Sequence, residues 1–537
     1  MKSLLNELLQ AGAHVQVLDG RLKLRATRDG LPEALLERVR ANRDALLAHL
    51  QSNRDATPPL RPYPRDGRPL PLSFTQERLW TLDQFLGGSA HYNIPLALRI
   101  TGAFDADAAE QALRRLVARH EPLRTVFTVE SGEPRAQVRE DFAFDLLRND
   151  LSHLPPSARE QRVRAEAAAD AAAAFDLSSD ILLRASWLNL DENEGVLLVN
   201  LHHIASDGWS MGVVVEEFAT LYQAVLDGTP DPLPALSLSY GDYAQWQREC
   251  LHGGAFDRRM DAWVQRLKGL PFAHSLPLDR LRPARPRYQA MRHERPLPAA
   301  AWPALQALAW SHDLTPFMLL HATLAVLIAR CSGEPDGVIG TPVANRPQRA
   351  LHGLVGFFAN TLVLRTDLGG EPTFVQFLRQ VRELHLQAQA NQDLPFELLV
   401  ERLNPVRSAQ IAPLFQILFT MDDAGPARAA RTLPGGLRIE PLVANELGAK
   451  FDLAFQAIDT GDGLVLSVDA DVDLFDAATA RRLLDCWATL IESVIATPEA
   501  PVALLPMLAA QELGPLLQRL RGERVALDLS ERVHERF

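Results

Sequence analysis

The residues with the clearest chemical potential lie in the stretch VNLHHIASDGWSMG, residues 199–212. Two adjacent histidines, His202 and His203, follow an apolar run, and Asp207 and Gly208 come shortly after them. Imidazole can accept or donate a proton near neutral pH, and a carboxylate can hold a cationic group. A histidine pair, a strand end and an Asp-Gly-Trp-Ser turn together are typical of a loop that carries function on a rigid support. These four residues are therefore the candidate catalytic positions.

The run VLLVNL, residues 196–201, has the apolar and β-branched character of a buried strand that ends at the histidines. Because neighbours on a strand face opposite ways, His202 and His203 cannot both enter one site, so at most one is catalytic and joint metal ligation is disfavoured. Asp207 lies roughly 13 Å beyond His203 in extended chain, too far for a hydrogen bond. A buried carboxylate there needs a cation, and an arginine from elsewhere in the chain is the expected partner.

A plainer interpretation of the same stretch requires no chemistry. His203 would be a core histidine with satisfied hydrogen bonds, and Asp207 would cap a helix predicted over residues 213–226. For a lone histidine this interpretation would be preferred. The coincidence of the histidine pair, the strand end and the turn favours catalysis instead.

The first fifty residues are predicted to form a separate small unit. Leucines at helical spacing predict a helix within 1–11, strands at 14–18 and 21–25 flank an Asp-Gly pair suited to a hairpin turn, and 31–50 is again helical. The proline-rich, charged stretch that follows cannot form a core and is expected to be a linker.

Cationic and apolar residues alternate along the second predicted strand of this unit. Arg21, Lys23 and Arg25 share one face, and Leu22 and Leu24 take the core side. Two interpretations stay open from the residues alone. The charges keep an edge strand soluble, or the strand accepts an acidic peptide by sheet extension.

Composition and charge limit the function classes. The chain has 537 residues, of which 47% are hydrophobic, and a net charge of −12, which disfavours nucleic acid as a partner. No run approaches the roughly 20 apolar residues of a membrane span, and the N-terminus lacks a secretion signal, so a cytoplasmic protein without membrane association is expected. Cys250, Cys331 and Cys486 are too scattered for a zinc or redox site.

From residue 71 onward the pattern is mixed α/β without a short repeat. A segment of this length should divide into two lobes that meet at a cleft, and 229–250 is a plausible place for the crossing. The elements expected are helices at 164–175, 213–226 and 374–390 and strands at 196–201, 337–342, 362–366, 414–421 and 464–470.

HHIASDG, residues 202–208, resembles the His-His-x-x-x-Asp-Gly signature of nonribosomal peptide synthetase condensation domains, relatives of chloramphenicol acetyltransferase. Six further stretches resemble that family's other motifs in the right order, and the resemblance covers residues 71 to about 515. The last of them departs from the family pattern at Pro405 and Gln410. The six are SFTQERLWTL (73–82), RHEPLRTVF (119–127), YGDYAQW (240–246), VGFFANTLVLR (355–365), NQDLPFE (391–397) and NPVRSAQIAPLFQ (404–416).

The resemblance implies a fold of the α/β (α+β) class. A small α-β-β-α docking domain is followed by a two-lobed, chloramphenicol-acetyltransferase-like pseudodimer with a V-shaped cleft and tunnel. The first fifty residues resemble N-terminal docking domains of the tubulysin-synthetase type, which favours the docking interpretation of the strand 21–25. The end, LSERVHERF, is similar to the start of an adenylation domain. The domains expected are 1–51 docking, 52–69 linker, 70–245 N-terminal lobe, 246–515 C-terminal lobe and 516–537 linker toward an adenylation domain missing from this chain.

The activity that the resemblance implies is amide formation between two carrier-bound thioesters. Each thioester sits on a phosphopantetheine arm that enters one face of the tunnel; the upstream acyl group is the donor and the downstream aminoacyl amine attacks. The chain itself is expected to bind no cofactor or metal. Its implied partners are the C-terminal tail of an upstream synthetase protein, expected to be acidic, the carrier domain of that protein, and the downstream adenylation and carrier domains.

The resemblance also implies roles for individual residues. His203 aligns the amine and takes its proton, while Asp207 pairs with Arg346 of VANRP or, as second choice, with Arg365. Gly208 leaves room for an arm. Positions assigned to the tunnel or substrate are Trp209, Ser210 and Asn360, and Arg78 and Arg124 are interpreted as packing or lobe-contact residues.

Related activities share the motif. An epimerization domain would use the same histidine to move an α-proton, but it normally follows a carrier domain. A heterocyclization domain carries Asp in place of His202, and a fused epimerising variant would show an additional His-His pair, whereas this chain has His91 beside Tyr92. A noncatalytic recruitment platform is the remaining alternative, against which His203 and Asp207 speak. DLPFE and SDGWS favour the subtype that joins two L-configured residues.

Overall fold

The computed structural model describes residues 13–18, 21–26, 38–39, 58–252, 256–406, 408, 410–423, 431–432, 436–442 and 447–521. Near the N-terminus, β1 (Ala13–Leu18) and β2 (Arg21–Ala26) pair in antiparallel register, which confirms the two strands predicted there. The side chains of both strands, the helix predicted within 1–11 and most of the one predicted within 31–50 lie outside the described residues.

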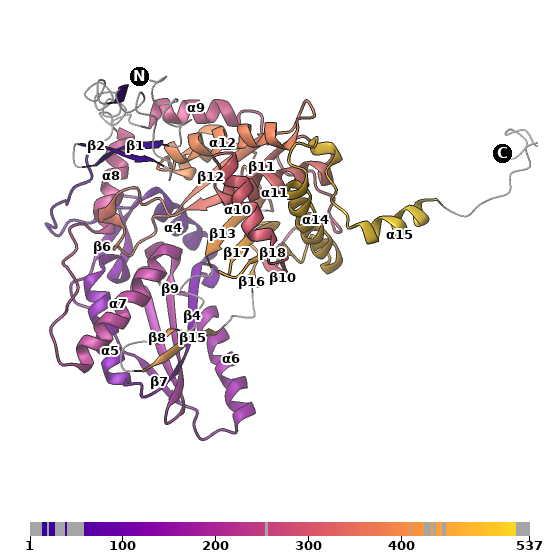
Figure 1. The fold of residues 1–537 in the computed structure, drawn as a ribbon. Helices are drawn as coiled ribbons and strands as arrows, with labels where there is room; N and C mark the ends of the chain where they lie inside the picture. Colours follow the sequence, from indigo (N-terminus) through magenta and orange to yellow (C-terminus); the bar gives the residue numbers. More distant parts are fainter. Residues whose placement is uncertain are drawn as a thin grey trace, which may run out of the picture.

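The N-terminal lobe is built on a six-stranded sheet of order β14-β15-β4-β9-β8-β7 (Figure 1). Its central strand β9 (Glu194–His202) is buried on both faces: Leu198 packs with α6 in one apolar cluster, and Leu197 packs with α5 and α7 in another. Burial on both faces explains why the run reads as continuously apolar rather than alternating. The other bounds are β4 (Asn93–Thr101), β7 (Leu147–Asp150), β8 (Leu183–Asp191), α4 (Phe74–Leu86), α5 (Ala106–Arg119), α6 (Pro156–Ala172) and α7 (Gly208–Leu226).

Two strands of this sheet come from late in the chain. β15 (Arg438–Leu442) pairs antiparallel with β4, and β14 (Arg431–Thr432) pairs with β15. The expected N-terminal lobe, residues 70–245, therefore lacks two strands of its own sheet, which come from residues 431–442. β14 and β15 extend the edge of a sheet whose four other strands come from much earlier in the chain, and such long-range pairing leaves no local pattern. A three-stranded sheet of β3 (Leu70–Pro71), β6 (Glu133–Val138) and β5 (Thr125–Glu130) completes the strands of this half.

The C-terminal lobe is built on a seven-stranded sheet of order β12-β11-β13-β17-β18-β10-β16, covered by helices that include α11 (Pro316–Ser332) and α14 (Ala477–Ala496). No single described helix is long and apolar enough to cross a membrane; α10 and α11 pass that test only as a pair, which is bent by 99°. The strands are β10 (Gln289–Pro296), β11 (Asp336–Val343), β12 (Asn360–Asp367), β13 (Ile417–Asp423), β16 (Leu447–Gly448), β17 (Leu453–Asp459) and β18 (Leu464–Asp471). The remaining helices are α8 (Tyr240–His252), α9 (Asp257–Leu267), α10 (Ala301–Ser311), α12 (Phe374–Ala390), α13 (Phe396–Leu403) and α15 (Ala510–Leu520).

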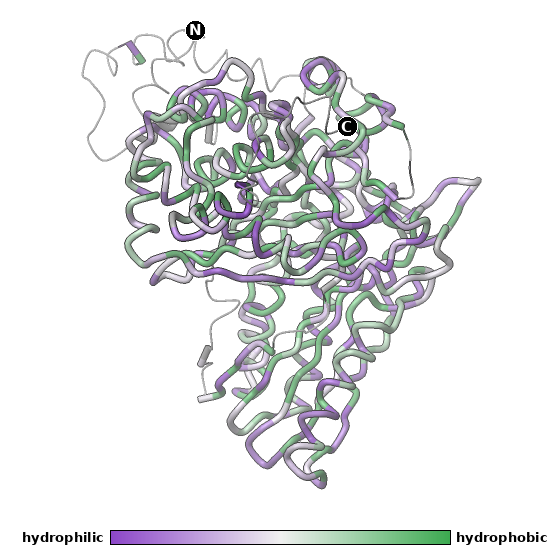
Figure 2. Tube along the Cα trace, turned by 90° about the vertical axis from the view of Figure 1, so that its right-hand side faces the viewer, coloured by the Kyte–Doolittle hydropathy of each residue, from purple (hydrophilic) through white to green (hydrophobic). Residues whose placement is uncertain are grey.

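The two lobes are distinct bodies that meet near the middle of the molecule (Figures 1 and 2). Helix α15 projects away from them (Figure 1). Helix α8 packs against both halves: Tyr243 and Trp246 share an apolar cluster with Phe358 and Phe415, and Tyr240, Gln247 and Arg248 hydrogen-bond to Ser73, Phe74 and Leu72. The lobe boundary expected between residues 245 and 246 falls inside this helix. Short 3-10 turns connect the elements: η1 (Ala90–Tyr92), η2 (Glu121–Arg124), η3 (His203–Ala205), η4 (Arg349–Leu351) and η5 (Val502–Leu504).

Candidate active site

His203 begins the turn η3 at the end of β9 and lies at the junction of the two lobes. Its Nδ1 is 2.8 Å from the carbonyl oxygen of Ser206. A carbonyl only accepts, so Nδ1 carries the proton and Nε2 keeps a lone pair. The ring packs against Phe357, with centroids 4.3 Å apart, and remains partly exposed to solvent. Burial, followed by the charge of Lys450, lowers the pKa of His203 to about 4, so the imidazole is neutral at physiological pH.

His202 points the other way, into the core beside α6. It is 1% exposed, its Nδ1 accepts from the N–H of Ile204 at 3.2 Å, and its ring contacts Phe175 edge to face. Burial lowers its pKa to about 4. The prediction that His202 is a catalytic position is therefore corrected. Because side chains alternate along a strand, the His202 ring lies in the core on the opposite face of β9 from His203.

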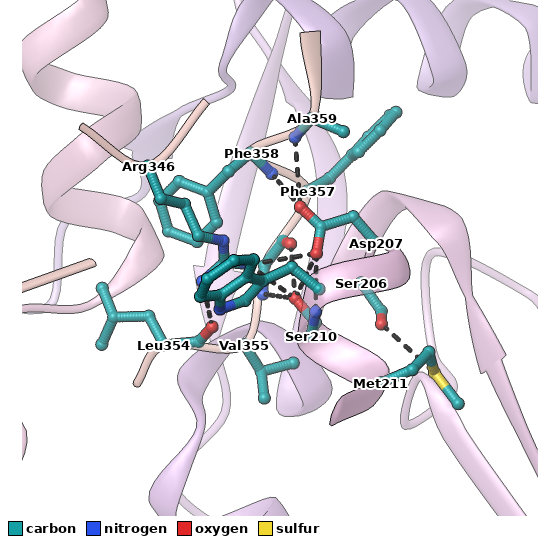
Figure 3. Close-up of polar contacts among 12 residues, drawn as sticks. Ser206, Asp207, Ser210, Met211, Arg346, Leu354, Val355, Phe357, Phe358 and Ala359 are labelled. Atoms are coloured by element: carbon teal, nitrogen blue, oxygen red, sulfur yellow. Dashed lines mark hydrogen bonds and ion pairs between the residues drawn. The ribbon is translucent and has the colours of Figure 1, made fainter. Parts of the chain in front are cut away.

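Asp207 makes five polar contacts, three of which join it to the C-terminal half (Figure 3). Its carboxylate accepts from the backbone N–H and hydroxyl of Ser210 at 2.8 and 2.6 Å, and from the backbone N–H groups of Phe358 and Ala359 at 3.0 and 3.1 Å. Arg346 Nη2 lies 3.0 Å away, with both side chains 1% exposed. Asp207 is thus the N-cap of α7 and an ion-pair partner at once, so the two predicted roles coexist.

Arg346 is anchored on its other side by the C-terminal half of the chain. Its Nη1 donates to the carbonyls of Leu351 and Leu354 at 2.7 and 2.6 Å, and its guanidinium lies 4.1 Å from the Phe358 ring centroid. Arg365, the second choice, is elsewhere: it pairs bidentately with Asp336 across β11 and β12, at 2.9 and 2.7 Å. The VANRP loop rather than strand β12 reaches the buried carboxylate.

Of the four positions assigned to the tunnel, arm or substrate, two are buried in hydrogen-bond networks. Ser210 is fully buried and bonds Asp207 and the backbone of Gly356, while Asn360 bonds the backbone of Gln392, Leu394 and Phe396. Both assignments are corrected, because short polar side chains there satisfy backbone groups. Trp209 is 45% exposed, and its indole N–H donates to the carbonyl of His352 at 2.9 Å. At Gly208, an added Cβ atom would meet no other atom within 4 Å.

Two residues of the C-terminal half contact η1, which directly precedes the Asn93 that pairs with His202, and the sequence analysis predicts neither contact. Lys450 Nζ lies 5.8 Å from the ring centroid of Tyr92, and the ring of Tyr288 lies 5.1 Å from that of His91. The sequence pattern around Lys450 and Tyr288 does not predict these contacts, because the chain topology brings distant segments together.

Arg78 is a contact between the two halves, as its interpretation holds. It lies over the Phe396 ring and 3.6 Å from the Glu397 carboxylate. Arg124 stays within the N-terminal lobe, where it donates to the carbonyls of Ala118 and Arg139. The docking side chains Arg21, Leu22, Lys23, Leu24 and Arg25 lie outside the described side chains, so their role stays a prediction.

Comparisons with known proteins agree with the geometry. The chain is 40% identical over 479 residues to a linear gramicidin synthase of Brevibacillus parabrevis, and 39% identical over 453 residues to phosphinothricin tripeptide synthetase PhsC of Streptomyces viridochromogenes. These matches cover 89% and 84% of this chain but only 6% and 42% of the relatives, so the chain spans a fraction of their length.

Among solved structures, the X-domain from teicoplanin biosynthesis in complex with OxyB superposes with a TM-score of 0.76 at 28% identity, covering 84% of this chain and 99% of that one. The condensation domain of the Monacolin K polyketide synthase shares the fold, with a TM-score of 0.68 at 21% identity, covering 81% of this chain and 99% of that one. The expected mixed α/β, chloramphenicol-acetyltransferase-like fold is confirmed. Residues 68–517 match the condensation domain family and residues 1–52 the TubC N-terminal docking domain, so the chain belongs to the condensation domains of nonribosomal peptide synthetases and carries a docking domain at its N-terminal side.

Proposed function

We propose that this chain forms an amide bond between an upstream carrier-bound acyl or peptidyl thioester and the amine of a downstream carrier-bound aminoacyl thioester. The single observation that carries the proposal is the state of His203: a neutral, partly exposed imidazole whose Nδ1–H is fixed by Ser206, leaving the Nε2 lone pair for an incoming proton. Both substrates are delivered on phosphopantetheine arms of separate carrier domains.

The chemistry needs little base strength. The neutral amine nitrogen attacks the thioester carbonyl carbon, the carbonyl becomes an oxyanion, and the Nε2 of His203 accepts the amine proton. Collapse then breaks the C–S bond and releases the upstream thiol, which takes the proton. Holding two tethered reactants at attack geometry can contribute about 7–11 kcal/mol, more than the roughly 10²- to 10⁴-fold typical of proton transfer. The position of His203 relative to the two reactants is therefore expected to contribute more to the rate than its basicity does.

A single-turnover assay tests the proposal. Two carrier proteins are loaded chemically, one with an L-aminoacyl donor and one with an aminoacyl acceptor, and the products on the acceptor arm are measured by mass spectrometry. The wild-type chain should transfer the donor, and His203→Ala should lose most of the rate while keeping the wild-type melting temperature. Equal turnover by His203→Ala would remove the assigned role. D-configured donors run in parallel test the L/L subtype.

A noncatalytic recruitment platform is the second candidate, because the chain superposes on an X-domain whose structure was solved in complex with OxyB. The same assay separates the two functions. A platform would bind loaded carriers without transfer under any loading, and His203→Ala would then leave carrier binding unchanged.

The docking domain is proposed to receive the acidic C-terminal tail of an upstream synthetase protein on the strand 21–25. Supporting this are the docking-domain match over residues 1–52 and the cations that alternate along β2. Replacing Arg21, Lys23 and Arg25 by Glu should abolish calorimetric binding of a synthetic Asp/Glu-rich peptide, whereas Lys268→Glu, far away in sequence, should leave it intact. Equal affinity in both variants would contradict the docking surface.

A further inference from the structure

Lys450 places a cation of the C-terminal half beside η1, whose Tyr92 directly precedes Asn93, the residue of β4 that pairs with His202 of β9. The neighbouring Ala449 N–H donates to the carbonyl of Tyr288 at 2.9 Å, which fixes the backbone there. The Lys450 Nζ lies 5.8 Å from the Tyr92 ring centroid, within cation–π range across the lobes. Solvent reaches the residue, yet surrounding protein lowers the pKa of its ammonium. Both facts fit a recessed, water-accessible position.

The backbone around Lys450 is held from the other side as well. Two residues later, the buried carboxylate of Asp452 accepts from His274 Nε2 and Arg282 Nη1, both at 2.9 Å, and the Asp452 N–H donates to the carbonyl of Gln416 at 3.0 Å. The backbone of Lys450 thus lies between two hydrogen-bonded residues, Ala449 and Asp452.

Two other charged groups at the junction lie in pairs, whereas Lys450 has no paired counter-charge among the residues that the structure describes. Asp207 is paired with Arg346 at 3.0 Å, and Glu397 lies 3.6 Å from Arg78. Within the part of the chain that the structure describes, Lys450 makes no hydrogen bond and no ion pair. The titratable groups around His203 and Lys450 are His91 and Tyr92 of η1, Arg78 of α4, His202 and Asp207 on either side of the η3 turn, Tyr288 before β10 and Glu397 of α13.

We propose that Lys450 is a positioning residue of the reaction, whose ammonium adds to burial in disfavouring protonation of His203 and disfavours protonation of the incoming acceptor amine. The inference rests on the proposed function. A positive charge disfavours a second one nearby, so an α-ammonium that enters beside Lys450 loses its proton more easily than in water. The acceptor amine is then neutral and can act as the nucleophile, and the Nε2 lone pair of His203 is free to accept its proton. Consistent with this, the charge of Lys450 acts on both His203 and His91 to lower their pKa.

The rate of a single turnover as a function of pH tests the proposal. The variants are Lys450→Gln, which removes the charge, and Lys450→Arg, which keeps it. An α-amine has an ordinary pKa of about 8, so below that value the rate rises about ten-fold per pH unit. Removing the cation should move the profile of Lys450→Gln upward by roughly one pH unit, at the low end of the effect of a nearby charge. With the amine pKa about 8 in Lys450→Gln and roughly one unit lower in the wild type, the loss is about five-fold at pH 7, approaches ten-fold at lower pH and disappears at high pH.

Controls separate electrostatics from damage to the fold. Lys450→Arg should retain the wild-type profile, and Lys268→Gln, at an exposed lysine after α9, should change neither rate nor profile. A loss of equal size at every pH, or a wild-type profile for Lys450→Gln, would overturn the proposal.

A second measurement needs no catalysis. Histidine NMR titration of the folded chain, with the His203 signal assigned through His203→Gln, should show a higher His203 pKa in Lys450→Gln and an unchanged one in Lys450→Arg. If the chain forms no amide while this shift is present, the proposed function fails and the electrostatic role of Lys450 stands. An unchanged His203 pKa in Lys450→Gln contradicts the role of Lys450 whatever the activity.

Discussion

Removing the carboxylate of Asp207 should destabilise the whole molecule as well as the reaction. Asp207→Ala leaves the Arg346 guanidinium buried without its counter-charge, and it leaves the backbone N–H groups of Phe358 and Ala359 without an acceptor. Breaking a buried pair from one side costs about 3–5 kcal/mol. Because both side chains are 1% exposed, solvent does not screen the pair, and the loss should be the same at low and high salt.

A double-mutant cycle shows whether the cost comes from the pair itself. Arg346→Met removes the cation and also leaves the carbonyls of Leu351 and Leu354 without a donor, so it too should be strongly destabilising. The double variant, Asp207→Ala with Arg346→Met, buries no unpaired charge and should be more stable than the sum of the single losses predicts, by about 0.5–3 kcal/mol.

Urea unfolding followed by circular dichroism, at two salt concentrations, supplies the free energies for this cycle. Strictly additive losses, or an Asp207→Ala variant that unfolds at the wild-type urea concentration, would refute the argument that Asp207 and Arg346 form a coupled buried pair.

Three further predictions concern histidines and arginines of known environment. His202→Ala should cost about 1–3 kcal/mol, because the Ile204 N–H loses its acceptor, while the partly exposed His203→Ala costs little; thermal melting compares them. Unfolded histidine has a pKa of about 6.5, whereas burial lowers the folded pKa of His202 and His385 to about 4 and that of His321 well below 6.5. The unfolded state therefore binds more protons than the folded state as the pH falls. The free energy of unfolding should drop by up to about 1.4 kcal/mol per pH unit per histidine between about pH 6.5 and pH 4. Equal urea midpoints at about pH 7 and about pH 5 would contradict this. Arg365→Ala breaks a part-exposed pair and should cost about 1 kcal/mol or less without changing turnover, unlike Arg346→Ala.

The local part of the site could be predicted from sequence because alternation on a buried strand is a local rule. The apolar run at 196–201 indicated β9, and adjacent positions had to face opposite ways, which separates His202 from His203 in the structure. The need for an arginine opposite a buried Asp207 followed from desolvation alone. The start of α7 was predicted at residue 213 although the helix begins at Gly208, since glycine and serine in its first turn hide a helix that the Asp207 cap begins.

Long-range neighbours could not be predicted in this way. β15 joins the sheet of the other lobe, and Lys450 reaches Tyr92, through chain topology rather than through any periodicity near those residues. The assignments of Ser210 and Asn360 to the tunnel failed for a related reason: a short polar side chain satisfies whichever backbone groups lie closest, and these come from distant segments.

The contacts of Asp207 tie the position of His203 to the closure of the two halves. The carboxylate is four residues from His203 in the chain, yet three of its donors, Arg346, Phe358 and Ala359, belong to the C-terminal half. Any opening of the junction must break these contacts or carry the η3 turn with it. Since the rate depends chiefly on where the two tethered reactants and the imidazole stand, a loosened pair at Asp207 should lower turnover even where the protein stays folded. The position of the His203 imidazole therefore depends on a carboxylate four residues away that bonds to both halves of the protein.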